Sequence, residues 1–339
     1  MNQEWQSFLS EQNAIFESND MIVSADLDNT CQKMDLSYLG IIKISGDDKQ
    51  TFLQGQLTSD TREINANNSQ LSSFCTPKGR ILASFRIFQS DDDWFLILPK
   101  QRLEPILKRL KMFVLMSKVT LEDVSDDFIC IGLTGECIEE NVKVPLPTTV
   151  NNVTQTDGNS FVLIDDKKTR FLVMGNFASI STLWNKCDNA AIVNASNWRL
   201  YDIQAGIPSI VDETSEAFIP QMLNLQLLDA VSFTKGCYTG QEIVARMQYL
   251  GKVKRRMYPV SFKSSLKPKA GDMVFSSTSQ SGQGAGKLVD VIEVSKDQYE
   301  GLSVIEIKSI EDETLRLYND EGPLLKVEQS PYSFEIEEN

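Results

Sequence analysis

The order of strand-like and helix-like segments between residues 40 and 121 constrains the fold most. A strand over 40–45 and a helix over 48–56 precede three strands at 71–76, 81–88 and 94–98. Leu103, Ile106 and Leu110 then recur at helical spacing, with Pro105 acceptable only in the first turn, before a last strand at 118–121. This order predicts an α+β domain of the ferredoxin-like plan.

The remainder of the chain is too long to belong to the same core. At 339 residues the chain predicts two or three domains. Strands are expected at 128–133 and 171–174, with a polar stretch around 151–160 between them, and a helix at 179–186. After Gly251 short strands alternate with turns, which indicates a small all-β closing domain.

The residue inventory excludes several kinds of site. With no histidine, the chain has no Ser-His-Asp or Cys-His nucleophilic system, so acid–base work falls to carboxylates, lysine, tyrosine or a thiol. Its six cysteines are scattered without a CxxC pair, which indicates neither a metal site nor a disulfide framework and fits a reducing compartment. No apolar run of membrane-spanning length and no signal peptide is present, so we expect a cytoplasmic protein without membrane contact.

The charge of the chain limits its partners. A formal net charge of −14 argues against broad electrostatic binding of nucleic acid. The densest basic segment is 246–256, which is read either as an ordinary solvated face or as a local anion site.

Residues 235–246 hold the best candidate reactive thiol, Cys237, between Gly236 and Gly240. The glycines permit tight or left-handed backbone, and Lys235 and Arg246 would favour the thiolate if they fold near it. The composition from Gln241 onward permits a helix, whose N-terminus adds positive potential. The alternative is a glycine turn with a small buried cysteine.

Several segments of the chain form a recognisable set. They are 52–58, 76–80, 117–119, 198–200, 205–208, 218–221, 224–225 and above all Lys235-Gly236-Cys237-Tyr238-Thr239-Gly240-Gln241-Glu242. Together these segments resemble the YgfZ family over roughly residues 39–260. The members of that family are folate-binding proteins of the aminomethyltransferase superfamily, linked to tRNA modification and iron–sulfur protein maintenance.

The resemblance implies a fold in three domains arranged as a cloverleaf around a channel for tetrahydrofolate or a one-carbon derivative. The expected parts are a discontinuous central folate-binding α+β domain at 1–45 and 125–235, a ferredoxin-like α+β domain at 46–124, a cysteine loop and linking helix at 236–249, and a C-terminal β-barrel at 250–339.

The same resemblance implies the site residues. Trp198 is the expected aromatic contact of the pterin, with core packing as its alternative reading. Leu39 stands where relatives can place a second tryptophan, and Glu242 is read as a ligand contact or as a first-turn carboxylate. The complete set is Cys237 as the key thiol, with Trp198, Leu39, Lys235, Tyr238, Glu242 and Arg246 around the folate and no metal ligand.

One departure from the superfamily pattern bears on activity. Our register puts Pro105, with Glu104 beside it, where true aminomethyltransferases carry an aspartate, so ordinary glycine-cleavage aminomethyl transfer is not expected. Whether the chain is an enzyme of another kind stays open, with a noncatalytic role favoured. The leading hypothesis is a tetrahydrofolate-binding accessory protein for assembly or repair of iron–sulfur enzymes, including those that modify tRNA. The alternatives are a folate-dependent one-carbon transferase or demethylase, and a noncatalytic tRNA-binding module using 246–256.

Overall fold

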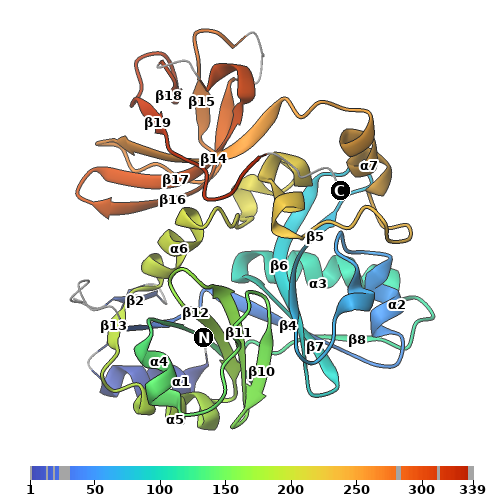
Figure 1. Cartoon of the computed structure of the whole chain (residues 1–339), viewed down its shortest axis with the longest axis vertical. Coiled ribbons are helices and arrows are strands. Elements are labelled where there is room, and N and C mark those ends of the chain that lie inside the picture. The colour runs from blue at the N-terminus through green and yellow to red at the C-terminus, as the bar shows by residue number, and fades with distance from the viewer. Residues whose placement is uncertain are drawn as a thin grey trace. The chain divides into compact units, whose positions relative to one another are not determined.

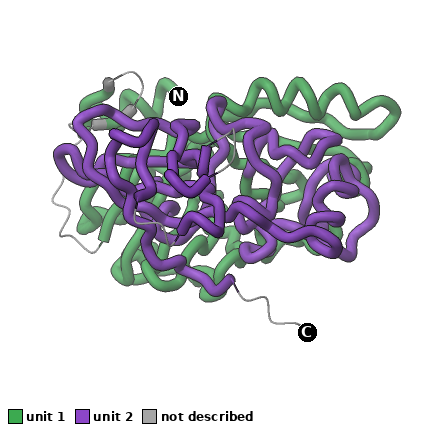
Figure 2. The backbone as a smooth tube through the Cα atoms, turned by 90° about the horizontal axis from the view of Figure 1, so that it is seen from above, with its two compact units in different colours: residues 1–52, 61–70, 85–198 green, residues 53–60, 71–84, 199–339 purple. Residues whose placement is uncertain are grey.

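The computed structural model describes residues 2–12, 14–17, 20–22, 31–279, 284–310 and 314–334, so the predicted segments 1–45 and 250–339 each include residues outside this description. The chain forms two compact units, each assembled from three stretches of sequence (Figure 2). Unit 1 comprises 1–52, 61–70 and 85–198, and unit 2 comprises 53–60, 71–84 and 199–339.

Unit 1 contains a six-stranded sheet in the order β10-β11-β12-β9-β3-β13 (Figure 1). Its pairs are antiparallel except β3 with β13, which run parallel. The strands are β3 (Gln32–Asp35), β9 (Ile129–Thr134), β10 (Val153–Thr156), β11 (Asn159–Asp165), β12 (Arg170–Gly175) and β13 (Ala191–Val193). In a separate two-stranded sheet, β1 (Ile15–Glu17) pairs antiparallel with β2 (Asp20–Ile22).

Helices cover the apolar side of this sheet. Trp5 and Leu9 of α1 (Gln3–Glu11) and Ile180 and Trp184 of α5 (Phe177–Lys186) enter the same core, to which α4 (Cys137–Val142) also contributes. The expected strands β9 and β12 and helix α5 are confirmed. The sequence reading missed α1, and it missed β10 and most of β11 because these strands lie in or beside the polar stretch around 151–160.

The predicted ferredoxin-like order of elements is observed. One sheet has the order β5-β6-β7-β4-β8, with the β6–β7, β7–β4 and β4–β8 pairs antiparallel, and α3 (Lys100–Val114) contacts β4, β7 and β8. Pro105 lies inside α3 beyond its first turn, and β8 starts at Thr120 rather than Lys118. The other elements are β4 (Leu39–Ser45), α2 (Lys49–Gln54), η1 (Thr61–Glu63), β5 (Ser69–Cys75), β6 (Ile81–Ser90), β7 (Asp93–Pro99) and β8 (Thr120–Asp123).

The C-terminal part of unit 2 is the expected barrel-like sheet, with strand order β18-β15-β16-β17-β14-β19. A bridge between Arg316 and Leu324 links its two edge strands, so the sheet is nearly closed on itself. Its strands are β14 (Arg255–Lys263), β15 (Met273–Phe275), β16 (Gly286–Ser295), β17 (Gln298–Glu306), β18 (Arg316–Leu317) and β19 (Leu325–Val327), with η5 (Ile307–Ser309) after β17.

A second core in unit 2 joins this sheet to earlier parts of the chain. Leu71, Cys75 and Ile81 pack in one cluster with Phe218 and Val304. The connecting elements are α6 (Ala195–Gln204), η2 (Asp212–Thr214), η3 (Pro220–Leu223), η4 (Leu225–Leu228) and α7 (Gln241–Tyr249).

The cysteines require a correction. Cys31 and Cys137 form a disulfide across 106 residues of sequence, which their scattered spacing did not indicate, because only the tertiary fold brings them together. Cys75, Cys130 and Cys187 are buried free thiols, and Cys237 is an exposed one. Among the described residues no cluster of metal-ligating side chains occurs. Within the same ranges, no helix has the length and apolarity needed to cross a membrane.

Candidate functional site

The segment Lys235–Gly240, hereafter the thiol loop, presents Cys237 to solvent directly before helix α7. Gly236 is exposed, and a Cβ added there would have no atom within 4 Å. Cys237 is therefore not the small buried core residue of the alternative reading; the loop leaves its sulfur accessible.

Lys235 holds the loop in place from beneath. Its side chain is 4% exposed, and its Nζ donates to the carbonyl oxygens of Leu57 at 2.8 Å and Ser59 at 2.7 Å. The same ammonium lies 5.1 Å from the centroid of the Tyr238 ring. A hydrogen bond from a charged donor contributes about 1.5–3 kcal/mol, so Lys235 acts as an anchor of the loop.

Tyr238 to Gly240 complete the attachment. Burial raises the pKa of the Tyr238 phenol, which keeps it neutral, and the amide N–H of Thr239 donates to the Gly55 carbonyl at 3.2 Å. Gly240 has φ +88°, and a Cβ there would lie 2.5 Å from the carbonyl oxygen of Thr76. Only glycine combines this backbone conformation with so close an approach.

Three other sequence segments that carry the family resemblance meet around this loop and α7. Besides 52–58 and 76–80, the segment 218–221 takes part: Gln221 is 1% exposed and its Nε2 donates to the Val244 carbonyl of α7 at 2.7 Å. The Arg80 guanidinium donates to the Ala217 carbonyl at 2.7 Å, and the N–H of Ile81 donates to the Phe218 carbonyl. The motifs thus build one support for Cys237 and α7.

Helix α7 carries Glu242 in its first turn and Arg246 in its last, and both side chains are exposed. A carboxylate near the N-terminus and a cation near the C-terminus both complement the helix dipole. Glu242 has the first-turn position of one reading, and its role as a ligand contact stays a prediction; the side chains of Glu242 and Arg246 are both accessible to a partner.

Trp198 and Leu39 belong to unit 1, whereas the other candidate residues belong to unit 2. Trp198 is 4% exposed; the Arg170 guanidinium lies 4.8 Å from its ring centroid, and a Cβ added at Gly132 would lie 2.5 Å from its Cε3. Leu39 is half-buried at the start of β4. The burial of Trp198 favours its packing role.

These positions test how well the predicted residues suit a folate. Trp198 has its ring covered by Arg170 and Gly132, Lys235 spends two donors on backbone carbonyls, and Tyr238 is 7% exposed. As placed within their units, these three do not fit the contacts that the resemblance implies for a pterin. Pro105 and Glu104 lie on the exposed side of α3.

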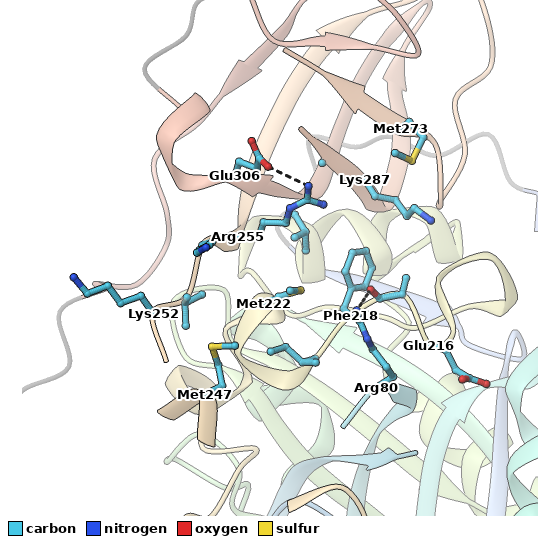
Figure 3. Close-up of a pocket in the computed structure, with 16 residues that line it drawn as sticks. Arg80, Glu216, Phe218, Met222, Met247, Lys252, Arg255, Met273, Lys287 and Glu306 are labelled. Atoms are coloured by element: carbon cyan, nitrogen blue, oxygen red, sulfur yellow. Dashed lines mark hydrogen bonds and ion pairs between the residues drawn. The ribbon is translucent and has the colours of Figure 1, made fainter. Parts of the chain in front are cut away.

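A cavity of about 950 Å³ lies within unit 2, and none of the predicted site residues lines it (Figure 3). Its polar lining consists of Arg80, Lys252, Lys254, Arg255, Lys287, Glu216 and Glu306. Arg80 lies in the resemblance segment 76–80, and Lys252, Lys254 and Arg255 lie in the basic stretch 246–256. Lys287 had no sequence signal, because only strand register brings it here.

Comparison with known proteins finds relatives from several bacteria that carry the same name. The chain is 35% identical over 258 residues to the tRNA-modifying protein YgfZ of Photobacterium profundum, covering 76% of this chain and 78% of that protein. The protein of the same name from Colwellia psychrerythraea is 35% identical over 228 residues, covering 66% and 70%. That of Escherichia coli strain SE11 is 29% identical over 306 residues, covering 89% and 93%.

A solved structure shows the same fold. The glycine cleavage system aminomethyltransferase T of Bartonella henselae superposes with a TM-score of 0.74 over 98% of this chain and 97% of its own, at 11% identity. The expected aminomethyltransferase-type fold is thereby confirmed. No family model matches the chain.

Proposed function

Because this chain belongs to the YgfZ family of tRNA-modifying proteins, we propose that it is a tetrahydrofolate-binding accessory protein that supports tRNA modification, with Cys237 as the thiol on which this role depends. In this proposal it acts by supporting the assembly or repair of iron–sulfur enzymes that modify tRNA.

The observation that carries the proposal is the exposed thiol on a firmly held loop. Cys237 itself is free and accessible, while Lys235, Thr239 and Gly240 on either side are fixed by hydrogen bonds or close backbone contact. A structure that only needed a turn would not require so much buried polar support beneath one exposed sulfur. The folate part rests on the family and its fold, and we assign it no contact residue.

The test replaces Cys237 by serine in the full chain. In cells that lack the native protein, Cys237→Ser is expected to leave the modified nucleosides of tRNA at the level of the empty vector, measured by mass spectrometry of digested tRNA. Its thermal unfolding midpoint is expected to match wild type, because the side chain is exposed. Gly236→Ala is the matched control, since its added Cβ meets nothing and modification should persist.

Folate binding is measured separately by calorimetric titration with tetrahydrofolate under anaerobic conditions. Wild type and Cys237→Ser are both expected to bind saturably. Absence of binding to folded wild type would remove the folate from the proposal, and full tRNA modification by Cys237→Ser would remove the thiol.

A further inference from the structure

Cationic side chains outnumber carboxylates in the lining of the cavity in unit 2. Glu306 accepts from Arg255 at 3.2 Å and lies 3.5 Å from Lys308, so the buried carboxylate of the cavity is already neutralised. Within the described residues no ion pair involves Arg80, Lys252, Lys254 or Lys287. Against these cations stands one exposed carboxylate, Glu216. The cavity therefore carries excess positive charge in a chain of net charge −14.

Strand register explains how one wall of the cavity arises. On β14, Arg255 pairs with Glu306 of β17. Val304 lies two residues before Glu306 on β17 and pairs with Lys287 of β16. Lys287 pairs on its other side with Met273 of β15. Residues two apart or directly opposite share one face of a sheet. The barrel-like sheet thus presents two cations and an apolar pair on a single face toward the cavity.

The facing wall is mostly apolar, with Arg80 and the exposed Glu216 as its charged residues. Phe218 and Met222 come from the segment leading into and through η3, and Met247 comes from the end of α7 (Figure 3). Figure 3 shows Arg80 and Phe218 across the cavity from Arg255 and Lys287. Three methionines, Met222, Met247 and Met273, line the space, and flexible thioether side chains adapt well to a flat ring.

From this combination we infer that the cavity binds a phosphate-bearing nucleotide, with the cations of both walls on the phosphate and the methionines against the base. A small inorganic anion would leave the apolar side unused, and an apolar ligand would leave the cations unused. The volume of about 950 Å³ is at the upper end of the range for small-molecule sites. A free mononucleotide and a nucleotide within an RNA strand offer the same chemistry; the inference rests on the proposed role in tRNA modification for choosing RNA as the natural source.

The test uses the full-length protein with two probes. Fluorescence anisotropy measures a labelled single-stranded RNA of about eight nucleotides, and calorimetry measures 5′-AMP. Lys287→Gln and Lys254→Gln are each expected to weaken RNA binding about fivefold. Each is also expected to reduce, by about one, the slope of the logarithm of the binding constant against the logarithm of the salt concentration. Lys263→Gln is the matched control, because Lys263 lies at the far end of β14, changes the charge equally and does not line the cavity.

The outcomes separate the sources and the alternatives. Weaker binding of both probes to Lys287→Gln, with unchanged binding to Lys263→Gln, supports the site. Binding of RNA without binding of 5′-AMP supports the site with an RNA strand as its ligand. Binding of 5′-AMP without binding of RNA supports the site with a free nucleotide as its ligand. If the protein binds neither RNA nor 5′-AMP, or if all three substitutions have equal effects, the inference is overturned. If Lys287→Gln abolishes tetrahydrofolate binding and tetrahydrofolate displaces the RNA, the cavity belongs to the folate and the nucleotide inference is wrong. The Cys237→Ser experiment is unaffected by any of these results.

Discussion

At the scale of single residues, the chain separates its free cysteines by environment. Burial raises the pKa of the Cys75 thiol to about 12 and that of Cys187 to about 11, and it raises the pKa of Cys130 as well. A raised thiol pKa means that these three remain neutral and unreactive near neutral pH. Cys237 alone among the described free cysteines is exposed.

This difference predicts selective alkylation. Native protein treated with iodoacetamide at about pH 8 is expected to carry one label, at Cys237, because the buried thiols are neither ionised nor accessible. Peptide mass spectrometry identifies the labelled position, and labelling in urea serves as the control in which Cys75, Cys130 and Cys187 also react. Rapid native labelling of Cys75 would contradict the burial of that thiol.

Lys235 and Trp198 show that residue type did not decide residue role. A lysine beside a reactive cysteine and a tryptophan in a family motif both suggest ligand contacts. In the structure the Lys235 ammonium satisfies two backbone carbonyls, and the Trp198 ring packs under Arg170. Lys235 holds the thiol loop in place, and Trp198 packs the first turns of α6.

At the scale of elements, the thiol loop depends on where α7 begins. Gly240 at φ +88° is the N-cap of α7, and its Cα lies so close to Thr76 that no Cβ fits. The β5–β6 turn and the first turn of α7 are thereby packed together, which fixes the direction from which the thiol loop enters the helix.

Gly240→Ala is therefore expected to destabilise the protein by about 2 kcal/mol or more, from left-handed backbone strain and the overlap with the Thr76 carbonyl. Chemical denaturation measures the loss of unfolding free energy, and the alkylation rate of Cys237 is expected to change because the loop shifts. Gly236→Ala, four residues earlier, is the control with no expected loss. Equal stability of the two variants would show that the close approach does not matter.

At the scale of the whole molecule, neither unit is a continuous piece of chain. The core of unit 2 combines Leu71, Cys75 and Ile81 with residues from beyond 199, and Thr58 donates to the Ala230 carbonyl at 2.7 Å. The N-terminal half of the chain thus supplies part of the support for the thiol loop.

A fragment of residues 199–339 is accordingly expected not to fold natively. Without 53–60 and 71–84 it would expose the apolar cluster around Phe218 and leave Lys235 without its carbonyl acceptors. Binding of a hydrophobic dye and a broad thermal transition are the expected signs, with co-expressed residues 1–198 restoring a sharp one. A fragment that melts cooperatively and binds no dye would refute this dependence.

The sequence by itself determined the local elements and the family. The strand and helix order over 40–121, the helix after Gly240 and the all-β closing domain follow from apolar periodicity and turn residues, which act within a few positions of one another. Helices α1 and α6 and strands β10 and β11 escaped it, because their patterns are short, weakly amphipathic or polar, and packing decides their conformation.

Only the tertiary structure decided which residues meet. The pairing of Cys31 with Cys137, the burial of the Lys235 ammonium on Leu57 and Ser59, and the meeting of Arg80 with Lys287 at one cavity all join positions far apart in the chain. No local pattern encodes such contacts, because strand register and core packing set them after the local elements have formed. The sequence could therefore single out Cys237, whereas its exposure, the anchoring role of Lys235 and the cationic cavity required the fold.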